Sequence, residues 1–509
     1  MAEEKKAEEA KSGELLFCGT TAWDAIGRRR SLPEENLVSP TRLRPLMGVD
    51  VRFVFSGCGM KGQLGHGDKI QRDRPTIVSA LSKHKVVTAG AGRSHTVVVT
   101  EDGLSFAFGW NKHGQLGSGS AKNEVESSPV RCAVSEVKAS VCGGEFTVWL
   151  TSIEGSSILT AGLPQYGQLG HGTDNEYNTK DSSVRLAYEA QPRPRAIASF
   201  AGETIVKVAC GTNHTVAVDK SGYVYTWGFG GYGRLGHREQ KDEWSPRRVD
   251  VFTRNNVLPP DAVVSAGSVN SACTAGGGQL YMWGKLKNNG DDWMYPKPLM
   301  DLSGWHLRCM DSGSMHHFVG SDSSCISWGH AQSGELGYGP LGQKSSAAPK
   351  KVDLLEGMHV VSVACGFAHS LVVVDRTNVA DRLEKLEIYD GKATGEGFED
   401  PNSKPEPAIV EKLPKRSSVK TSQKKRKKGK DSSESESEDE DNIDSDDSDD
   451  SGKEMNGKYS GKGRGKNSGK SAPRKKSGGR GSGRPPKSPS PLTSEGGKGT
   501  GKRGRPRKT

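Results

Sequence analysis

Eight residues near the N-terminus combine three glycines with a histidine, a composition found in phosphate-binding loops and metal-binding turns. The segment KGQLGHGD runs from Lys61 to Asp68. Similar segments, GQLGSGS, GQLGHGT, GRLGHRE and GELGYGP, begin at Gly114, Gly167, Gly233 and Gly334. A catalytic loop is rarely needed five times, so the repetition favours glycines that serve turns or close strand approach. We expect neither a cofactor nor a metal at these loops.

No other segment has the spacing of an enzyme active site. The sequence lacks a G-x-S-x-G elbow, a P-loop lysine after the glycines, an H-E-x-x-H helix motif and the kinase motifs. We therefore predict no catalytic residues.

Two further signatures accompany the glycine loop. A short strand ending in glycine, such as YTWG or CISWG, lies eight residues before the last glycine of the loop. A G-x-x-H segment followed by an apolar strand precedes that strand in turn. Its histidines are His95, His214, His316 and His369. We expect each of them to bond a neighbouring backbone group rather than a metal ion.

The repeat unit predicts a β-propeller. Seven strand-ending glycines are spaced by 38 to 66 residues, which fits one four-stranded sheet per unit. They are Gly19, Gly57, Gly109, Gly162, Gly228, Gly284 and Gly329. The last His strand has no Trp-Gly strand after it, and the N-terminus supplies one without a His strand. We therefore predict an all-β, seven-bladed propeller over residues 15–376, closed by pairing of the N- and C-terminal strands.

One blade is too short. Gly57 fits two positions of the repeat that are 17 residues apart in complete units, such as Gly92 and Gly109. About 17 residues, equivalent to two strands, are therefore missing between Val54 and Met60. A shortened transcript or gene model, or a natural half-blade, would explain the gap. In the chain as written we expect a destabilised ring with exposed strand edges.

These motifs resemble the regulator of chromosome condensation family of seven-bladed propellers, whose units carry the pattern GxxHS…WGxNxxGQLG. The segments CGTTAWDAIGR, WGFGGYGRLGHREQKDE and MYPKP look like the telophase-disk, or second, type. That resemblance implies association with chromosomes and with small GTPases of the Rac/Rho, Ral or Ran type. In the Ran-exchange founder, loops of one propeller face and a wedge from one blade engage the GTPase. A plant ultraviolet-B photoreceptor of the family has Trp at the G-x-x-H site, which is absent here, so photoreception is not expected.

Two surface loops exceed the repeat and are candidates for partner binding. The first loop contributes Arg185, Tyr188, Arg193 and Arg195. The second contributes Trp244, Arg247 and Arg248. Arginine beside aromatic residues is common at interfaces, although ordinary solvated loops would also have this composition.

The ends of the chain differ in composition from the propeller. Residues 401–509 carry 29 Lys/Arg against 16 Asp/Glu, whereas residues 1–400 carry 43 against 45. We expect disorder in residues 1–14 and 401–509, with residues 377–400 forming a linker that contains one short helix. No segment resembles a secretory signal or a membrane span, and the nine cysteines contain no CxxC pair. These features indicate a reducing compartment and no membrane partner.

The tail first offers a two-part nuclear import signal over residues 415–428. Its basic residues are Lys415, Arg416, Lys424, Lys425, Arg426, Lys427 and Lys428. An acidic block, residues 431–450, follows and suits basic partners such as histones. Ser433, Ser435 and Ser437 each have Glu three residues later, which is the pattern of an acid-directed kinase.

The basic end of the tail, residues 453–509, predicts DNA binding. Arg503, Gly504, Arg505 and Pro506 form the core of an AT-hook, and Arg484 and Pro485 form a weaker copy. Arginines flanking an extended Gly-Pro backbone suit the narrow minor groove of A·T-rich DNA. Ser488 and Ser490 each precede proline, so phosphorylation there would weaken DNA binding. The sequence thus favours a nuclear, chromatin-associated scaffold that binds a small GTPase and could act as its exchange factor, or alternatively a histone adaptor without GTPase activity.

Overall fold

The computed structural model describes residues 12–21, 36–52, 54, 61–72, 74–153, 155, 157–173, 176–178 and 186–390. They form six sheets of four or five strands and one two-stranded hairpin, and the pairs are antiparallel except for β2 with β27. Residues 1–404 form one compact unit and residues 405–509 a second. No helix of the described residues is long and apolar enough to span a membrane.

Each sheet is one propeller blade, in which the chain meanders from an inner strand to an outer one. The first two blades contain β3 (Val86–Ala91), β4 (His95–Thr100), β5 (Ser105–Trp110) and β6 (Val125–Arg131), then β7 (Val137–Cys142), β8 (Phe146–Thr151), β9 (Ile158–Gly162) and β12 (Gln191–Ala196). The next two contain β13 (Ile205–Cys210), β14 (His214–Asp219), β15 (Val224–Gly228) and β16 (Glu243–Arg248), then β17 (Val264–Ala266), β18 (Asn270–Ala275), β19 (Gln279–Gly284) and β20 (Trp293–Pro298). The fifth contains β21 (Leu307–Ser312), β22 (His316–Ser321), β23 (Cys325–Gly329) and β24 (Ser346–Lys351). The closing blade contains β25 (Val360–Cys365), β26 (His369–Val374), β1 (Glu14–Thr20), β2 (Asn36–Leu43) and β27 (Ile388–Tyr389).

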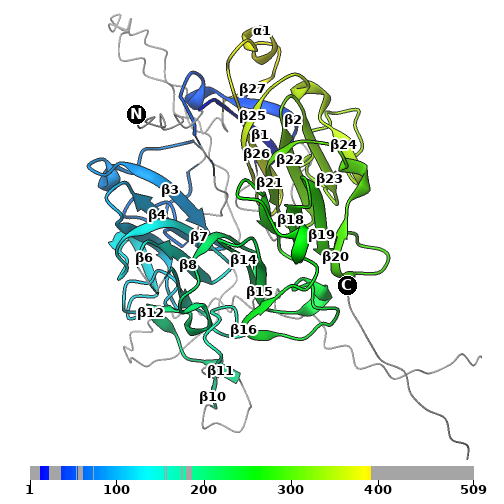
Figure 1. Ribbon diagram of the computed structural model, residues 1–509. Coiled ribbons are helices and arrows are strands. Elements are labelled where there is room, and N and C mark those ends of the chain that lie inside the picture. The colour runs from blue at the N-terminus through cyan, green and yellow to red at the C-terminus, as the bar shows by residue number, and fades with distance from the viewer. Residues whose placement is uncertain are drawn as a thin grey trace, which may run out of the picture. The chain divides into compact units, whose positions relative to one another are not determined.

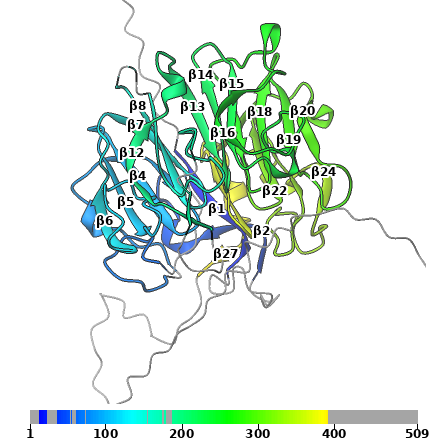
Figure 2. The ribbon, with the colours of Figure 1, turned by 90° about the horizontal axis from the view of Figure 1, so that it is seen from below.

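The blades are arranged around a common centre (Figures 1 and 2). Inner strands pack side by side in the order β3, β7, β13, β17, β21 and β25. Five apolar cores, each of 10 to 13 buried residues, lie between successive blades. Two glycine-loop leucines belong to these cores, Leu116 beside Trp149 of the next blade and Leu169 beside Trp227, and Leu235 and Leu336 are also buried. Burial between blades therefore replaces a single central core.

Strands from the two ends of the described propeller complete the closing blade. β1 pairs with β26 in an antiparallel register in which Phe17 lies opposite Leu371. This is the closure predicted from the sequence. Residues 377–390, where the sequence suggested a linker, pack onto this blade through helix α1 (Ala380–Leu383), whose Leu383 is buried, and through β27, which pairs with β2.

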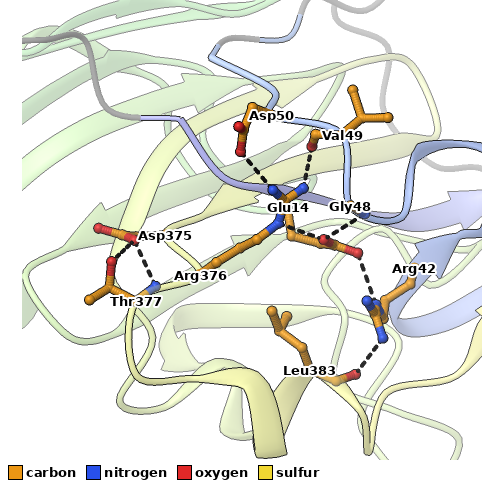
Figure 3. Close-up of polar contacts among 9 residues, drawn as sticks. All are labelled: Glu14, Arg42, Gly48, Val49, Asp50, Asp375, Arg376, Thr377 and Leu383. Carbon is orange, nitrogen blue, oxygen red and sulfur yellow. Dashed lines mark hydrogen bonds and ion pairs between the residues drawn. The ribbon is translucent and has the colours of Figure 1, made fainter.

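A buried ion cluster reinforces this closure (Figure 3). The carboxylate of Glu14, whose residue is 2% exposed, accepts hydrogen bonds from Arg42 Nε and Arg376 Nε, both at 2.9 Å. Arg376 also contacts Asp50 at 2.6 Å and donates to the carbonyl of Val49. One N-terminal carboxylate thus holds groups from β2 and from the residues after β26.

The described residues form six complete blades, and the seventh, which the sequence predicted to be truncated, has no sheet among them. Between β2 and β3 the described residues contain no strand, only an isolated bridge between Gly13 and Val51. The segment of about 17 residues missing from the repeat corresponds to two strands, which are the strands that the remaining outer segment would pair with in a complete blade. Ile70 and Ile77 in this segment are 66% and 83% exposed. We call residues 52–85 the short unit.

The repeated glycines have the structural role predicted from the sequence. Gly109 has φ +111°, and a Cβ there would lie 2.8 Å from the Cα of His95 on the neighbouring strand. Gly117, at φ +62°, lies against the Trp149 ring, where a Cβ would approach to 2.4 Å. Any other residue would be strained in conformation and in space.

The repeated histidines link one blade to the next. Their Nε2 atoms contact hydroxyls at these distances: His95 to Thr147 2.9 Å, His214 to Ser271 2.8 Å, and His316 to Ser370 3.0 Å. Each hydroxyl donates its proton to the second residue of a glycine loop, at Gln115 O, Arg234 O and Glu335 O. Since each hydroxyl has only one proton, Nε2–H must be the donor in the first contact. The predicted structural role is confirmed, but the partner is a side-chain hydroxyl and not a backbone group.

Burial keeps these histidines neutral. It lowers the pKa values of His95 and His369 to about 4 and that of His316 to about 3. Asn270 occupies the same position in the blade of β17 to β20, and its Nδ2 donates to Ser312 Oγ at 3.4 Å. The position therefore accepts an amide donor in place of histidine, and in the blade of β7 to β12 it is filled by the apolar ring of Phe146.

Candidate partner interface

One face of the propeller carries the two kinds of loop that the repeat builds. In every meander, the G-x-x-H turn and the loop from the third to the fourth strand leave the sheet at the same end. We call this end the loop face. The longest excursion on it runs from β9 to β12 and includes the hairpin of β10 (Glu176–Asn178) and β11 (Leu186–Tyr188). In Figure 1 this hairpin extends away from the blades.

A row of aromatic and basic side chains lies on the loop face beside this excursion. The Tyr166 and Phe229 rings are 4.7 Å apart, and the Arg234 guanidinium lies 4.6 Å from the centre of Phe229. Arg234 also lies 5.4 Å from the Tyr232 ring, which Lys285 Nζ approaches to 4.7 Å. We call these five residues the aromatic–cation row. It crosses three successive blades, and aromatic and guanidinium groups of this kind are enriched at energetically important positions of protein interfaces.

Arg234 fixes the centre of the row. It replaces the glutamine of Gly-Gln-Leu-Gly, whose side chain elsewhere bonds its own loop, as Gln168 Oε1 does with Tyr166 N at 2.7 Å. Arg234 is 2% exposed and donates to Gly231 O at 2.9 Å and to Ser268 O of the next blade at 2.7 Å. Where the repeat glutamine bonds only its own loop, Arg234 therefore links two blades and places a positive charge in a buried position.

The backbone of the same loop is unusual. Tyr232 has φ +61°, in the left-handed region that favours glycine. Such conformations cost about 1–3 kcal/mol for other residues and are concentrated at functional sites. Nearby, burial raises the pKa of Asp242, although its carboxylate accepts a bond from Gly230 N at 2.8 Å and the Arg234 charge acts in the opposite direction. The loop is therefore held by its own polar contacts in a conformation that presents an aromatic ring.

The first predicted loop is only partly visible. Arg185 lies outside the described residues, and Tyr188 ends β11 and is half-buried. Arg193 and Arg195 are exposed on alternate positions of β12. The alternating residues Pro192 and Pro194 pack on the glycine loop of the previous blade. The two arginines point away from the blade core and are available to an acidic partner.

In the second predicted loop, the arginine side chains already contact other residues of the propeller. Arg247 pairs with Glu239 at 2.6 Å and Glu243 at 2.7 Å, and this pairing raises its pKa. Arg248 lies 3.4 Å from the centre of the Tyr223 ring. Trp244 is half-buried against Gly167. Of these three residues, Trp244 lies beside the aromatic–cation row, whereas Arg247 already has acidic partners.

Sequence reasoning missed the aromatic–cation row because its members are scattered along the chain from Tyr166 to Lys285. The change from Gln to Arg at position 234 was visible, but without blade packing it could not be placed beside Tyr166 or Lys285. The predicted nuclear import, phosphorylation and DNA-binding residues of the tail all lie outside the described residues and remain predictions.

Comparison with known proteins gives the same family as the repeat. The family model described as the RCC1-like domain matches residues 52–381. Protein RCC2 of Mus musculus is 37% identical over 422 residues, covering 74% of this chain and 80% of its own length. The ultraviolet-B receptor UVR8 of Arabidopsis thaliana is 32% identical, covering 64% of this chain and 70% of its own.

Solved structures support the fold. Prp20p of Saccharomyces cerevisiae, whose structure was described with its binding properties to Gsp1p and histones, has a TM-score of 0.55 at 17% identity and covers 76% of this chain and 98% of its own. Human WBSCR16 has a TM-score of 0.54 at 20% identity, and the match covers 72% of this chain and 100% of WBSCR16. From the repeat, the blade architecture and these similarities, the chain belongs to the RCC1-like propeller family and is similar to its RCC2 members.

Proposed function

We propose that this protein is a nuclear, chromatin-associated scaffold that binds a small GTPase of the Rac/Rho, Ral or Ran type through its loop face. The observation that carries the proposal is the β10–β11 excursion beside the aromatic–cation row. In the founder of the family, loops of one face and a wedge from one blade engage the GTPase. The hairpin projects from the same end of its blade as the row, and we propose that it acts as such a wedge.

A role in nucleotide exchange is consistent with this surface. Exchange requires tighter binding of the nucleotide-free GTPase than of the loaded form, and no proton transfer or covalent step by the scaffold. A projecting hairpin and fixed aromatic anchors would supply binding energy without catalytic groups. Within the described residues, no group of three His, Cys, Asp or Glu side chains is placed to hold a metal ion.

The test uses the full chain and a panel of small GTPases, nucleotide-free and GTP-loaded, with binding and nucleotide release measured together. Selective capture of one nucleotide-free member with faster release supports an exchange factor. Capture of a GTP-loaded member without release supports an effector scaffold. No capture of any member contradicts the proposal.

A histone adaptor without GTPase activity is the second candidate. It is favoured by the charge of the tail and by the histone binding described for Prp20p. Histone octamers captured by the full chain, with no GTPase captured from the panel, would make it the better description.

We further propose that the tail tethers the protein to A·T-rich DNA through Arg503 and Arg505. The support is the sequence pattern alone. Changing both arginines to alanine should remove the preference for A·T over G·C duplexes at matched salt concentration, with a smaller loss of total affinity because the other basic residues remain. An unchanged A·T to G·C ratio would contradict this assignment.

A further inference from the structure

Three outer strands carry the same four-residue pattern, Ser-Pro-x-Arg. It occurs at residues 39–42 in β2, 128–131 in β6 and 245–248 in β16. One class of proline-directed kinases selects serines with proline at the next position and a basic residue three positions after the serine. The three serines share this sequence pattern, but they differ in solvent exposure in the folded protein.

The outer strands bulge where the pattern lies. In the pair of β15 and β16, Thr226 lies opposite Arg247 and Gly228 opposite Glu243, so four steps along β16 match two along β15. Ser245 and Pro246 therefore stand outside the regular ladder. The pairing of β5 with β6 has the same irregularity around Ser128. The bulge leaves Ser245 and Pro246 without ladder partners in their own sheet, and the chain is held just before them by the bond from Gly172 N to Trp244 O at 2.8 Å.

Exposure distinguishes the three copies. Ser245 and Ser128 are exposed, whereas Ser39 is 6% exposed. The strand of Ser39 is the one that β27 covers, through pairing of Arg42 with Ile388. The same sequence pattern thus occurs in two accessible bulges and in one buried one.

We propose that Ser245 is a phosphorylation site for a kinase that selects proline at the next position and a basic residue two positions further, that Ser128 is a second such site, and that Ser39 is not one. In the reaction, Ser245 Oγ forms a bond to the γ-phosphorus of ATP as the bond from that phosphorus to the bridging oxygen of ADP breaks. The hydroxyl proton leaves to the kinase base.

The modification would change the local ion pairs. Arg247, two residues away, is held by Glu239 and Glu243. A phosphate of nearly two negative charges competes for that guanidinium and repels both carboxylates. Because Trp244 is the preceding residue, the change occurs at the edge of the aromatic–cation row.

The test incubates the folded full chain with ATP and a cyclin-dependent kinase that prefers basic residues at the third position, and measures the phosphorylation rate of each serine by mass spectrometry. Three peptides, spanning residues 36–46, 125–135 and 242–252, serve as unfolded references. Ser245→Ala removes the site, and Arg248→Ala removes the basic determinant while leaving the hydroxyl. Site-resolved detection separates these serines from Ser488 and Ser490 of the tail.

We expect all three peptides to react, and the folded chain to react at Ser245 and Ser128 at least roughly tenfold faster than at Ser39, because reaction at Ser39 requires local opening. Arg248→Ala should slow Ser245 without affecting Ser128. Equal rates at Ser39 and Ser245 in the folded chain, or a folded chain unreactive at Ser245 whose peptide reacts, would overturn the proposal. Peptides that do not react would overturn the assignment of the motif.

Discussion

The closing blade and the short unit are adjacent in the chain, yet they differ sharply in how they are held. The closing blade contributes to a core of 13 buried residues, including Leu16 from the N-terminal side and Val372 from the C-terminal side. Among the described residues, the core between the short unit and the blade of β3 to β6 is small and consists of Leu81, Val98 and Phe108. Chain ends far apart in sequence thus form a complete blade, while a continuous segment does not.

The difference indicates that a propeller tolerates a break in the chain better than a loss of strands. A break is repaired by pairing β1 with β26 and by the Glu14 cluster, since all backbone partners are present. Lost strands leave donors, acceptors and apolar faces that no other segment supplies. Stability should therefore be concentrated at the closing blade and lowest at the short unit.

The largest predicted effect comes from Glu14→Ala. It leaves Arg42 and Arg376, whose side chains are 12% and 29% exposed, without their shared carboxylate. We expect a loss of about 3 kcal/mol in the free energy of unfolding, at the low end for a broken buried ion pair because Arg376 keeps some solvent. Urea denaturation measures it. A loss below about 1 kcal/mol would show that the cluster is not what holds the closure.

The next effect should come from completing the short unit. Inserting a copy of residues 93–109 after Gly57 would supply the two missing strands. Because Ile77 would then lie on a paired strand, we expect hydrogen exchange and proteolysis within residues 61–78 to slow by roughly 30-fold, or about 2 kcal/mol of local opening free energy. The matched control inserts 17 Gly and Ser residues, which should give no protection. Equal protection by both insertions would contradict the blade register.

A smaller effect concerns pH and the inter-blade histidines. The unfolded chain binds a proton near pH 6.5, whereas burial lowers the pKa of His95 to about 4 and of His316 to about 3 in the folded state. Stability is therefore complete above pH 6.5 and falls as the pH falls toward 4, by up to about 1.4 kcal/mol per pH unit for each histidine. His316→Asn, which copies the residue found at Asn270, should flatten this dependence while keeping the donor. The urea midpoint between pH 7 and 5 measures it, and an unchanged slope would contradict the assignment.

The smallest effect should come from the exposed pair of Arg44 and Asp390, whose side chains are 58% and 59% exposed. Arg44→Ala removes an ion pair in the same closing blade as Glu14, but one that water screens. We expect a change in unfolding free energy of less than about 1 kcal/mol. If it equalled the effect of Glu14→Ala, burial would not be what makes the Glu14 cluster important.

Much of the fold followed from residue spacing, because each repeat position has one physical role. Gly109 must adopt a positive φ, Leu116 must enter an inter-blade core, and His95 must meet the next blade. The number of complete blades followed in part, since the spacing around Gly57 predicted a unit that lacks two strands but not where residues 61–85 would lie. The Glu14 cluster and the aromatic–cation row were also out of reach, because both join residues that only tertiary packing brings together.

The candidate partner interface was predicted from excess loop length, and this criterion selected the excursion from β9 to β12 but not the aromatic–cation row beside it. Arginines were favoured by composition, yet Arg247 is neutralised by two glutamates that lie within eight residues of it in sequence. Phe229 and Tyr232 were passed over because they lie inside the repeat. Both rings contact Arg234, which also donates a hydrogen bond to Ser268 O of the next blade.

The central claim is that the loop face binds a small GTPase, and the most direct measurement is the affinity of the full chain for the GTPase captured from the panel. Phe229→Ala on the loop face is compared with Leu354→Ala, a 47% exposed residue in the turn η8 (Asp353–Leu355) that follows an outer strand on the opposite face. We predict that Phe229→Ala weakens binding by roughly tenfold or more and that Leu354→Ala leaves it unchanged. Unchanged binding by Phe229→Ala together with a loss in Leu354→Ala would place the interface on the other face and contradict this claim.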